Sequence, residues 1–272
     1  MADGTSAGSA ERRETQRFGT IIVVGGGCYG SFFVRQLGRA WRAGAIAWDT
    51  LLVVDRDPAC AVVQLPESER PRELRIAITA WRTFFDEYLS NAARDPDGHA
   101  NDAIVPSPLM PHLMADWLVD RAAARWPSRR VDVTPLESAP AVPWQRAGED
   151  GTHYVSFADW MCPINCVEPV RCPHTREARS WSMPAALREY AAAEGSAGRE
   201  VAGTFVFHCV HRAYGVGMID TRDVLAADAT IADRGREGAV FLLGTASHCH
   251  GAVRRVVIGA EGKRPESRVG ML

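Results

Sequence analysis

Three short segments of the sequence contain ten of its fifteen cysteines and histidines. These residues are Cys162, Cys166, Cys172 and His174 in the first segment, His208, Cys209 and His211 in the second, and His248, Cys249 and His250 in the third. Thiolates and imidazoles are the ligands that zinc, copper and iron–sulfur clusters select. Reduced thiols and core histidines would account for any one segment, but the three together predict a bound metal ion or cluster.

The second and third segments lie where ligand sites are often built. FHCVHR and SHCHG each follow an apolar stretch that predicts a strand, so their cysteines and histidines fall at the carboxyl end of that strand. In parallel α/β sheets this edge is where ligands bind. We therefore expect the loop with three cysteines to fold over the edge and to share one site with the other two segments.

The spacing in CPINCVEPVRCPH leaves two kinds of metal centre open. Zinc accepts this spacing, and Cys162, Cys166, Cys172 and His174 would make a closed Cys3His set. The prolines after Cys162 and Cys172 are similar to those in the cysteine loops of ferredoxins, but the spacing differs from the ferredoxin pattern and assigns no residue. An iron–sulfur cluster would need a fourth ligand, which Cys209 or Cys249 could supply.

Charged and aromatic residues flank the same loop. The charged ones are Glu168, Arg171, Arg176 and Arg179. They could bind an anionic substrate, although solvated surface charge is the ordinary role of such residues. Trp160 and Trp181 bracket the loop, and we expect them to pack it.

A second candidate site lies near the start of the chain, in IIVVGGGCYG. Gly25, Gly27 and Gly30 fit the pattern G-x-G-x-x-G after an apolar strand and at the start of a helix, where backbone N–H groups face a pyrophosphate. Asp55 ends the next apolar stretch, where a carboxylate holds ribose hydroxyls. Cys28 lies within the loop, and its thiol either faces the cofactor or fills the turn. A structural glycine turn without a ligand is the alternative.

The same residues resemble known nucleotide-binding proteins. IIVVGGGCYG and VVDRD are similar to Rossmann-type NAD(P)-binding proteins, especially to the short TrkA-N-like domains, and also to the dehydrogenase part of siroheme synthases. The resemblance implies a fold and a bound nucleotide but no reaction. Asp55 favours NAD because it would repel a 2′-phosphate, whereas Arg56 beside it keeps NADP open. FAD-binding proteins share this opening.

Strands and helices alternate along the chain. Hydrophobic periodicity predicts strands at 20–24, 51–54, 102–108, 129–137, 153–157, 204–208 and 240–244, and helices at 29–43, 80–93, 109–126, 184–194 and 221–232. We expect an α/β fold, with a Rossmann-like, mostly parallel sheet and a C-terminal α/β extension that carries the Cys/His-rich loop. The predicted organisation is a disordered tail at 1–17, a dinucleotide-binding domain at 18–137, a linker at 138–151, a metal-binding segment at 152–259 and a second tail at 260–272.

Composition limits the partners. With 272 residues, a net charge of −2 and only one lysine, Lys263, the chain has no basic face for nucleic acid. No apolar stretch is long enough to span a membrane, and the polar N-terminus predicts a cytoplasmic protein without a secretory signal. A small-molecule substrate or a redox partner is expected, and the sequence leaves a homo-oligomer open.

These observations favour an NAD(P)-dependent oxidoreductase that couples a nicotinamide cofactor to an iron–sulfur or zinc centre. The alternative is a non-catalytic NAD(H)-sensing or regulatory protein with a structural zinc site. A zinc hydrolase or a chelatase-like enzyme with an empty nucleotide site is a third interpretation. An open coordination position is the feature that would separate these classes.

Overall fold

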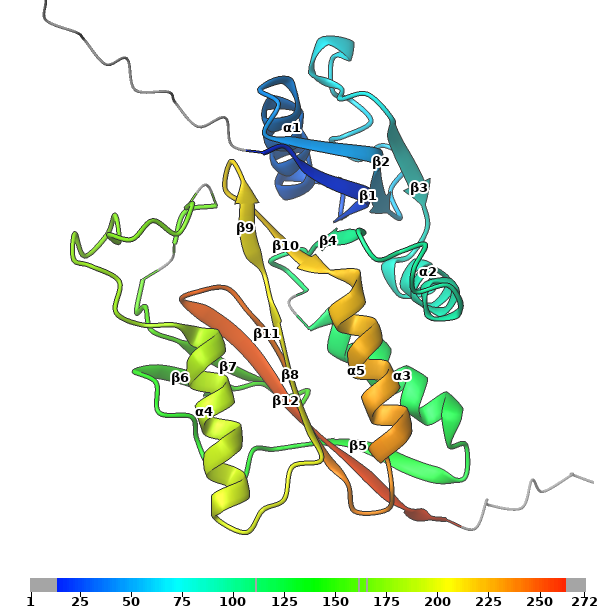
Figure 1. The fold of residues 1–272 in the computed structure, drawn as a ribbon, viewed down its shortest axis with the longest axis vertical. Coiled ribbons are helices and arrows are strands. Elements are labelled where there is room, and N and C mark those ends of the chain that lie inside the picture. Colours follow the sequence, from blue (N-terminus) through cyan, green and yellow to red (C-terminus); the bar gives the residue numbers. More distant parts are fainter. Residues whose placement is uncertain (1–13, 111, 161, 165, 263–272) are drawn as a thin grey trace, which may run out of the picture.

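The structure is a computed structural model that describes residues 14–262 except 111, 161 and 165. Its first sheet has the strand order β3-β2-β1-β4-β10-β9 (Figure 1). The strands are β1 (Gln16–Val24), β2 (Ile46–Asp55), β3 (Leu74–Ile78), β4 (Ala103–Val105), β9 (Val210–Ala213) and β10 (Val216–Asp220). The first four are parallel, whereas β10 runs antiparallel to β4 and to β9.

The second sheet has the order β6-β7-β12-β11-β8, and β5 also pairs with β12. The strands are β5 (Arg129–Thr134), β6 (Trp144–Ala147), β7 (His153–Ser156), β8 (Gly203–His208), β11 (Val240–Ala246) and β12 (His250–Glu261). β8 and β11 are parallel, and the other pairings in this sheet are antiparallel. The long strand β12 therefore organises this sheet, because β5, β7 and β11 all pair with it.

Helices lie between and outside the two sheets. They are α1 (Cys28–Arg42), α2 (Trp81–Arg94), α3 (Leu113–Arg125), α4 (Met183–Ser196) and α5 (Thr221–Arg234), with a short 3-10 turn, η1 (Glu67–Glu69). One core joins buried side chains of both sheets to α2, α3 and α5, including Ile22, Phe85, Trp117 and Phe241. A second core packs α1 against the first sheet, and α4 covers the second sheet. The two sheets are thus linked by a shared apolar core.

One run of chain passes directly from the second sheet to the first. β8 ends at His208 and β9 begins at Val210, so the yellow segment in Figure 1 is an edge strand of one sheet and then of the other. The pairing of β5 with β12 also crosses the predicted linker at 138–151, and β6 lies inside that linker. The predicted division into two domains stays a prediction, but strand pairing does not follow its boundary.

Most predicted elements are confirmed within a few residues, and the α/β class is confirmed in its coarse form. The expectation of a mostly parallel arrangement holds only for β1 to β4 and for the pair β8 and β11. The predicted tail at 260–272 is wrong at its start, because β12 extends to Glu261, and β1 likewise begins inside the predicted tail at 1–17. The remaining tail residues, 1–13 and 263–272, lie outside the described residues.

Within the described ranges, no helix combines the length and the apolar character that crossing a membrane requires.

Candidate metal centre

The second and third Cys/His segments meet at the carboxyl ends of two parallel strands. His208 ends β8 and pairs in register with Ala246, which ends β11. The N–H of Cys209 donates to the carbonyl of Ala246 at 2.8 Å, so the two strands stay together beyond their last residues. The rings of His208 and His248 lie 6.3 Å apart, measured between centroids. The expected convergence at the carboxyl edge is therefore present.

Glu168, from the cysteine-rich loop, completes a cluster with these two histidines. One ligand atom each from Glu168, His208 and His248 lies within 4.8 Å of the others, a set hereafter called the triad. Within the part of the chain that the structure describes, it is the only group of three or more such side chains that meets this spacing. Two imidazoles and one carboxylate can hold a divalent transition metal ion and leave further coordination positions open.

Backbone contacts fix Glu168 in this position. Its Oε1 accepts the backbone N–H of His248 at 2.7 Å, and its carbonyl accepts Nη1 of Arg179 at 2.5 Å. Glu168 has a φ of 50°, a left-handed conformation that is uncommon for a residue other than glycine. The loop thus holds the carboxylate against the sheet edge that carries the two histidines.

Burial favours the neutral form of His208 and His250. Burial lowers the pKa of His208, and the charge of Glu168 opposes this effect. Burial also lowers the pKa of His250. Neutral imidazole is the form that binds metal ions, so both rings are held in the protonation state that coordination needs.

The thiol of Cys162 lies against His250 rather than against the triad. Cys162 Sγ is 3.2 Å from His250 Nε2, and His250 Nδ1 is 2.8 Å from the hydroxyl of Ser156. Burial raises the pKa of Cys162 to about 11, with further contributions from the charges of Cys249 and Cys166. Several cysteines of the predicted set are therefore close enough to influence one another electrostatically.

The predicted closed Cys3His set is not assembled within liganding distance among the described residues. The ring of His174 stacks on Trp160 with centroids 4.3 Å apart. Cys172 is buried, and backbone N–H groups of Thr175 and His174 lower its pKa.

Two further members of the second segment lie outside the liganding spacing of the triad, although the charge of Glu168 acts on both. Burial raises the pKa of Cys209 to about 12, and a Cβ added at Gly217 would lie 2.5 Å from its sulfur. Its thiol is therefore packed closely against β10. His211 Nδ1 is buried and has no hydrogen-bond partner among the described atoms.

The glycine-rich turn after β1 has the shape that an anion site requires. Gly25 has a φ of 87°, and its N–H donates to the carbonyl of Val54 at 2.8 Å. A Cβ on Gly30 would lie 1.8 Å from the carbonyl oxygen of Gly25, so only glycine fits where α1 packs against the turn. Gly27 is exposed, and a Cβ there would meet no atom within 4 Å. No side chain caps α1, so its first N–H groups remain available to a ligand.

Asp55 holds this turn. Its Oδ2 accepts the N–H of Gly26 at 2.6 Å, and its Oδ1 accepts the N–H of Asp57 at 2.9 Å. The thiol of Cys28 is exposed at the start of α1, whereas buried Cys60 packs against Gly26. The carboxylate predicted to contact ribose therefore has a structural role in the turn.

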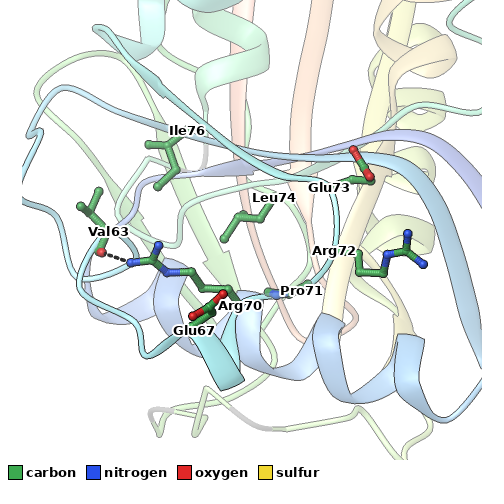
Figure 2. Close-up of a pocket in the computed structure, with 8 residues that line it drawn as sticks. All are labelled: Val63, Glu67, Arg70, Pro71, Arg72, Glu73, Leu74 and Ile76. Atoms are coloured by element: carbon green, nitrogen blue, oxygen red, sulfur yellow. Dashed lines mark hydrogen bonds between the residues drawn. The ribbon is translucent and has the colours of Figure 1, made fainter.

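A surface hollow of about 650 Å³ lies beside β3 (Figure 2). It is lined by Val63, Glu67, Arg70, Pro71, Arg72, Glu73, Leu74 and Ile76. Arg70 Nη2 donates to the carbonyl of Val63 at 2.6 Å, and its Nε donates to the carbonyl of Leu65 at 2.9 Å. The guanidinium of Arg70 therefore binds backbone carbonyls of the segment at 63–65. None of the triad residues and none of the glycines of the turn after β1 lines the hollow.

Glu168 was expected to be a solvated surface charge or a contact to an anionic substrate, and not a metal ligand. The available signal was its position between Cys166 and Cys172, in a loop already expected to cover the sheet edge. The positive φ that directs its carboxylate inward has no sequence signature of the kind that glycine provides.

Comparison with known proteins gives one match. Residues 114–259 match a family model described as “Uncharacterized protein, C-terminal domain”. No curated protein matches the chain, and no solved structure matches it. The matched region contains the triad and all ten cysteines and histidines of the three segments, whereas the glycine-rich turn lies before it.

Proposed function

The chain belongs to the family described as “Uncharacterized protein, C-terminal domain”, and we propose that it is a metal-dependent oxidoreductase whose divalent metal ion is bound by Glu168, His208 and His248. The observation that carries this proposal is the spacing of the three ligand atoms, which all lie within 4.8 Å of one another. The metal ion would supply Lewis acidity or a redox centre at the carboxyl edge of β8 and β11.

The number of protein ligands favours an enzyme over a structural metal site. Structural zinc sites are closed by four protein ligands, whereas catalytic sites keep a position for water or substrate. The triad has three members, so a bound ion would have a position left for an exogenous ligand. His208 and His248 would orient the ion from the strand ends, and Glu168 would lower the net charge of the site.

Arg179 acts in this proposal as a positioning residue. Its bond to the carbonyl of Glu168 holds the left-handed turn that directs the carboxylate inward. The Nε of Arg179 is buried and unpartnered among the described atoms. This arrangement would fix the carboxylate ligand before the metal ion arrives, which lowers the cost of ordering the site on binding.

The redox class of the proposed reaction rests on a Rossmann-like nucleotide site in the first sheet. The parallel order β3-β2-β1-β4 supports this fold, because it is the order of the first four strands of a Rossmann sheet. Ligands of such sheets bind at the carboxyl edge where the strand order reverses, which here is between β1 and β4. The N–H groups at the start of α1 would hold the pyrophosphate of NAD or NADP, with Gly27 giving it room to approach. A nicotinamide cofactor would supply hydride chemistry.

The other candidate function is an NAD(H)-sensing protein with structural zinc. Cys172 favours it, because the backbone N–H groups of Thr175 and His174 lower the pKa of its thiol and so favour the thiolate, the form that binds a metal ion. The two functions predict different responses to an exogenous ligand. An open triad binds an added anion, whereas a closed set of cysteines does not.

Metal titration of the apoprotein tests the triad. We expect His208→Ala, His248→Ala and Glu168→Gln each to weaken Co²⁺ binding by at least about tenfold and to remove one equivalent per chain. His174→Ala is the matched control, because its ring stacks on Trp160 outside the triad. Normal metal content in the triad variants, with loss in His174→Ala, would reject the triad in favour of the Cys3His set.

Azide binding separates the catalytic from the structural class. We expect azide to change the visible absorption of the Co²⁺-loaded wild-type protein, because an open position accepts the anion. The variant His208→Ala should lose this response. A spectrum of the loaded wild type that does not change at any azide concentration would contradict the open site and favour the sensor.

A further inference from the structure

We propose that Cys162, Cys166, Cys249 and His250 form a second metal site, which takes one thiophilic divalent cation such as Zn²⁺. This site lies beside the triad but shares no side chain with it, because His248 belongs to the triad and His250 belongs to the thiol group. The HCH segment would thus give its two histidines to two different metal ions.

The hydrogen bonds of Ser156 fix the tautomer of His250. The hydroxyl donates to the carbonyl of Ala158 at 2.6 Å and accepts the N–H of the same residue at 2.8 Å. Its remaining contact, 2.8 Å to Nδ1 of His250, must therefore be donated by the ring. Nε2 then carries the lone pair, and this nitrogen faces the sulfur of Cys162.

The contact between Cys162 and His250 already has nearly the spacing of two zinc ligands. Sγ and Nε2 are 3.2 Å apart. A tetrahedral zinc ion would hold such a sulfur and nitrogen about 3.5 Å apart, from the usual bond lengths. An ion could replace the shared proton with a shift of a few tenths of an ångström, and the hydroxyl of Ser156 would serve as the outer partner that metal-binding histidines usually have.

Two further thiols can complete the set. Cys249 is 4% exposed, and its sulfur accepts Nε1–H of Trp181 at 3.2 Å. Cys249 directly precedes His250 in the chain, and Cys166 lies four residues after Cys162 in the same loop. Beyond the effect of burial, the charges of Cys249 and Cys166 raise the pKa of Cys162, as nearby thiols would. Among the described residues the four donor atoms do not all lie within 4.8 Å, so the loop must close around the ion. Each coordinating thiol releases its proton to solvent on binding.

Cobalt spectroscopy distinguishes this site from the triad. We expect the wild-type protein to bind two Co²⁺ per chain and to show thiolate-to-cobalt charge-transfer absorption. Cys162→Ser and His250→Ala should each lose one equivalent and most of that absorption. His208→Ala should lose the other equivalent and keep the charge-transfer band. Cys28→Ser is the matched control, because Cys28 is an exposed thiol outside the group.

The two proposals fail separately. A charge-transfer band that persists unchanged in Cys162→Ser would overturn the thiol site and leave the triad standing. Stoichiometric iron and acid-labile sulfide in anaerobically purified protein, lost in Cys162→Ser, would overturn a mononuclear ion in favour of a cluster.

An experiment on the wild-type protein tests the same site where a variant fails to fold. In the wild-type apoprotein, Zn²⁺ should protect the partly exposed thiols of Cys162 and Cys166 from alkylation, as mapped by mass spectrometry, while Cys28 stays reactive. Equal labelling of Cys162 and Cys166 with and without Zn²⁺ would overturn the site.

Discussion

The backbone N–H of Gly26 donates a 2.6 Å hydrogen bond to the carboxylate of Asp55, which ties the glycine-rich turn after β1 to the end of β2. The second oxygen of the same carboxylate is occupied by the N–H of Asp57. Asp55, which the sequence predicts as a ribose ligand, therefore also stabilises the glycine-rich turn. Any substitution of Asp55 must be interpreted for both roles.

Asp55→Ala should lower the free energy of unfolding by about 1–2 kcal/mol, because it leaves the N–H of Gly26 without its partner. NADH binding should weaken as well, since the turn loses its fixed shape. Asp55→Asn keeps an acceptor oxygen and should restore part of the stability. Urea unfolding and fluorescence titration with NADH measure the two effects. Asp49→Ala, at an exposed position, is the control. Wild-type stability in Asp55→Ala would show that the hydrogen bond between Gly26 and Asp55 does not stabilise the protein.

An added methyl group should lower the stability of the protein at one glycine of this turn and leave it unchanged at another. Gly30→Ala places a Cβ 1.8 Å from the carbonyl oxygen of Gly25 and should cost about 3 kcal/mol or more, because backbone must move. Gly27→Ala meets open space and has a φ of −72°, so stability should be unchanged. If a pyrophosphate approaches the turn, Gly27→Ala should weaken NADH binding at least about tenfold. Equal NADH affinity in Gly27→Ala and wild type would contradict a nucleotide at this turn.

The sequence predicted the first parallel strands well because their signals are local. The C-terminal halves of β1 and β2, at 21–24 and 51–54, are continuous apolar runs that are almost wholly buried, and the glycine pattern marks the turn between β1 and α1. No strand was predicted at 250–261, because the two adjacent arginines of HGAVRRVVIGAE interrupt its apolar pattern. In the structure Arg254 is buried and paired, and Arg255 binds Glu137. Their partners lie more than a hundred residues away, beyond the reach of a local pattern.

The candidate site was likewise predictable where it depends on local sequence and not where it depends on tertiary contacts. The convergence of His208 and His248 was predictable, because both follow strands that are parallel and adjacent. The separation of His250 from His248 was not, since it depends on a serine contact made across β7 and β12. Residue types therefore indicated the ligands, but only tertiary geometry divided them into groups.

Tyr88→Phe should destabilise the junction between α2, β4 and α5. The hydroxyl of Tyr88 donates to Oδ2 of Asp102 at 2.7 Å and lies 3.2 Å from the hydroxyl of Thr221. Burial raises the pKa of Tyr88 well above its usual value, so the hydroxyl stays protonated as a donor. Asp102 is 3% exposed and loses one of its donors in the variant, at a cost of about 1–2 kcal/mol. Thermal unfolding measures the change.

The control for this junction is Tyr214→Phe, because Tyr214 is 42% exposed. Its unfolding temperature should match that of the wild type. An equal loss in the two variants would mean that the hydroxyl of Tyr88 contributes nothing specific, and that Asp102 is satisfied by Thr20 and His99 alone.

Acid should weaken the contact between β12 and the turn that joins β6 to β7 through Asp150. Arg254, which is buried on β12, donates to Asp150 at 2.6 Å and to the hydroxyl of Thr152 at 2.7 Å, and it also pairs with Asp116 on α3. Burial alone would raise the pKa of Asp150, but hydrogen bonds from Thr152 and Arg254 outweigh it and lower the pKa to about 2.

Because the folded-state pKa of Asp150 lies below its unfolded value of 3.8, its stabilising contribution is complete above that value and is lost as pH falls toward 2. The side chain is 47% exposed, so solvent screening reduces the contribution to about 1 kcal/mol. Asp150→Asn should therefore be less stable than wild type at pH 7, and the difference should shrink as pH falls toward 2 and vanish below that value. Asp233→Asn, at an 82% exposed position, should match wild type throughout. A stability difference for Asp150→Asn that stays constant from pH 7 to pH 2 would show that the ion pair with Arg254 does not account for its acid response.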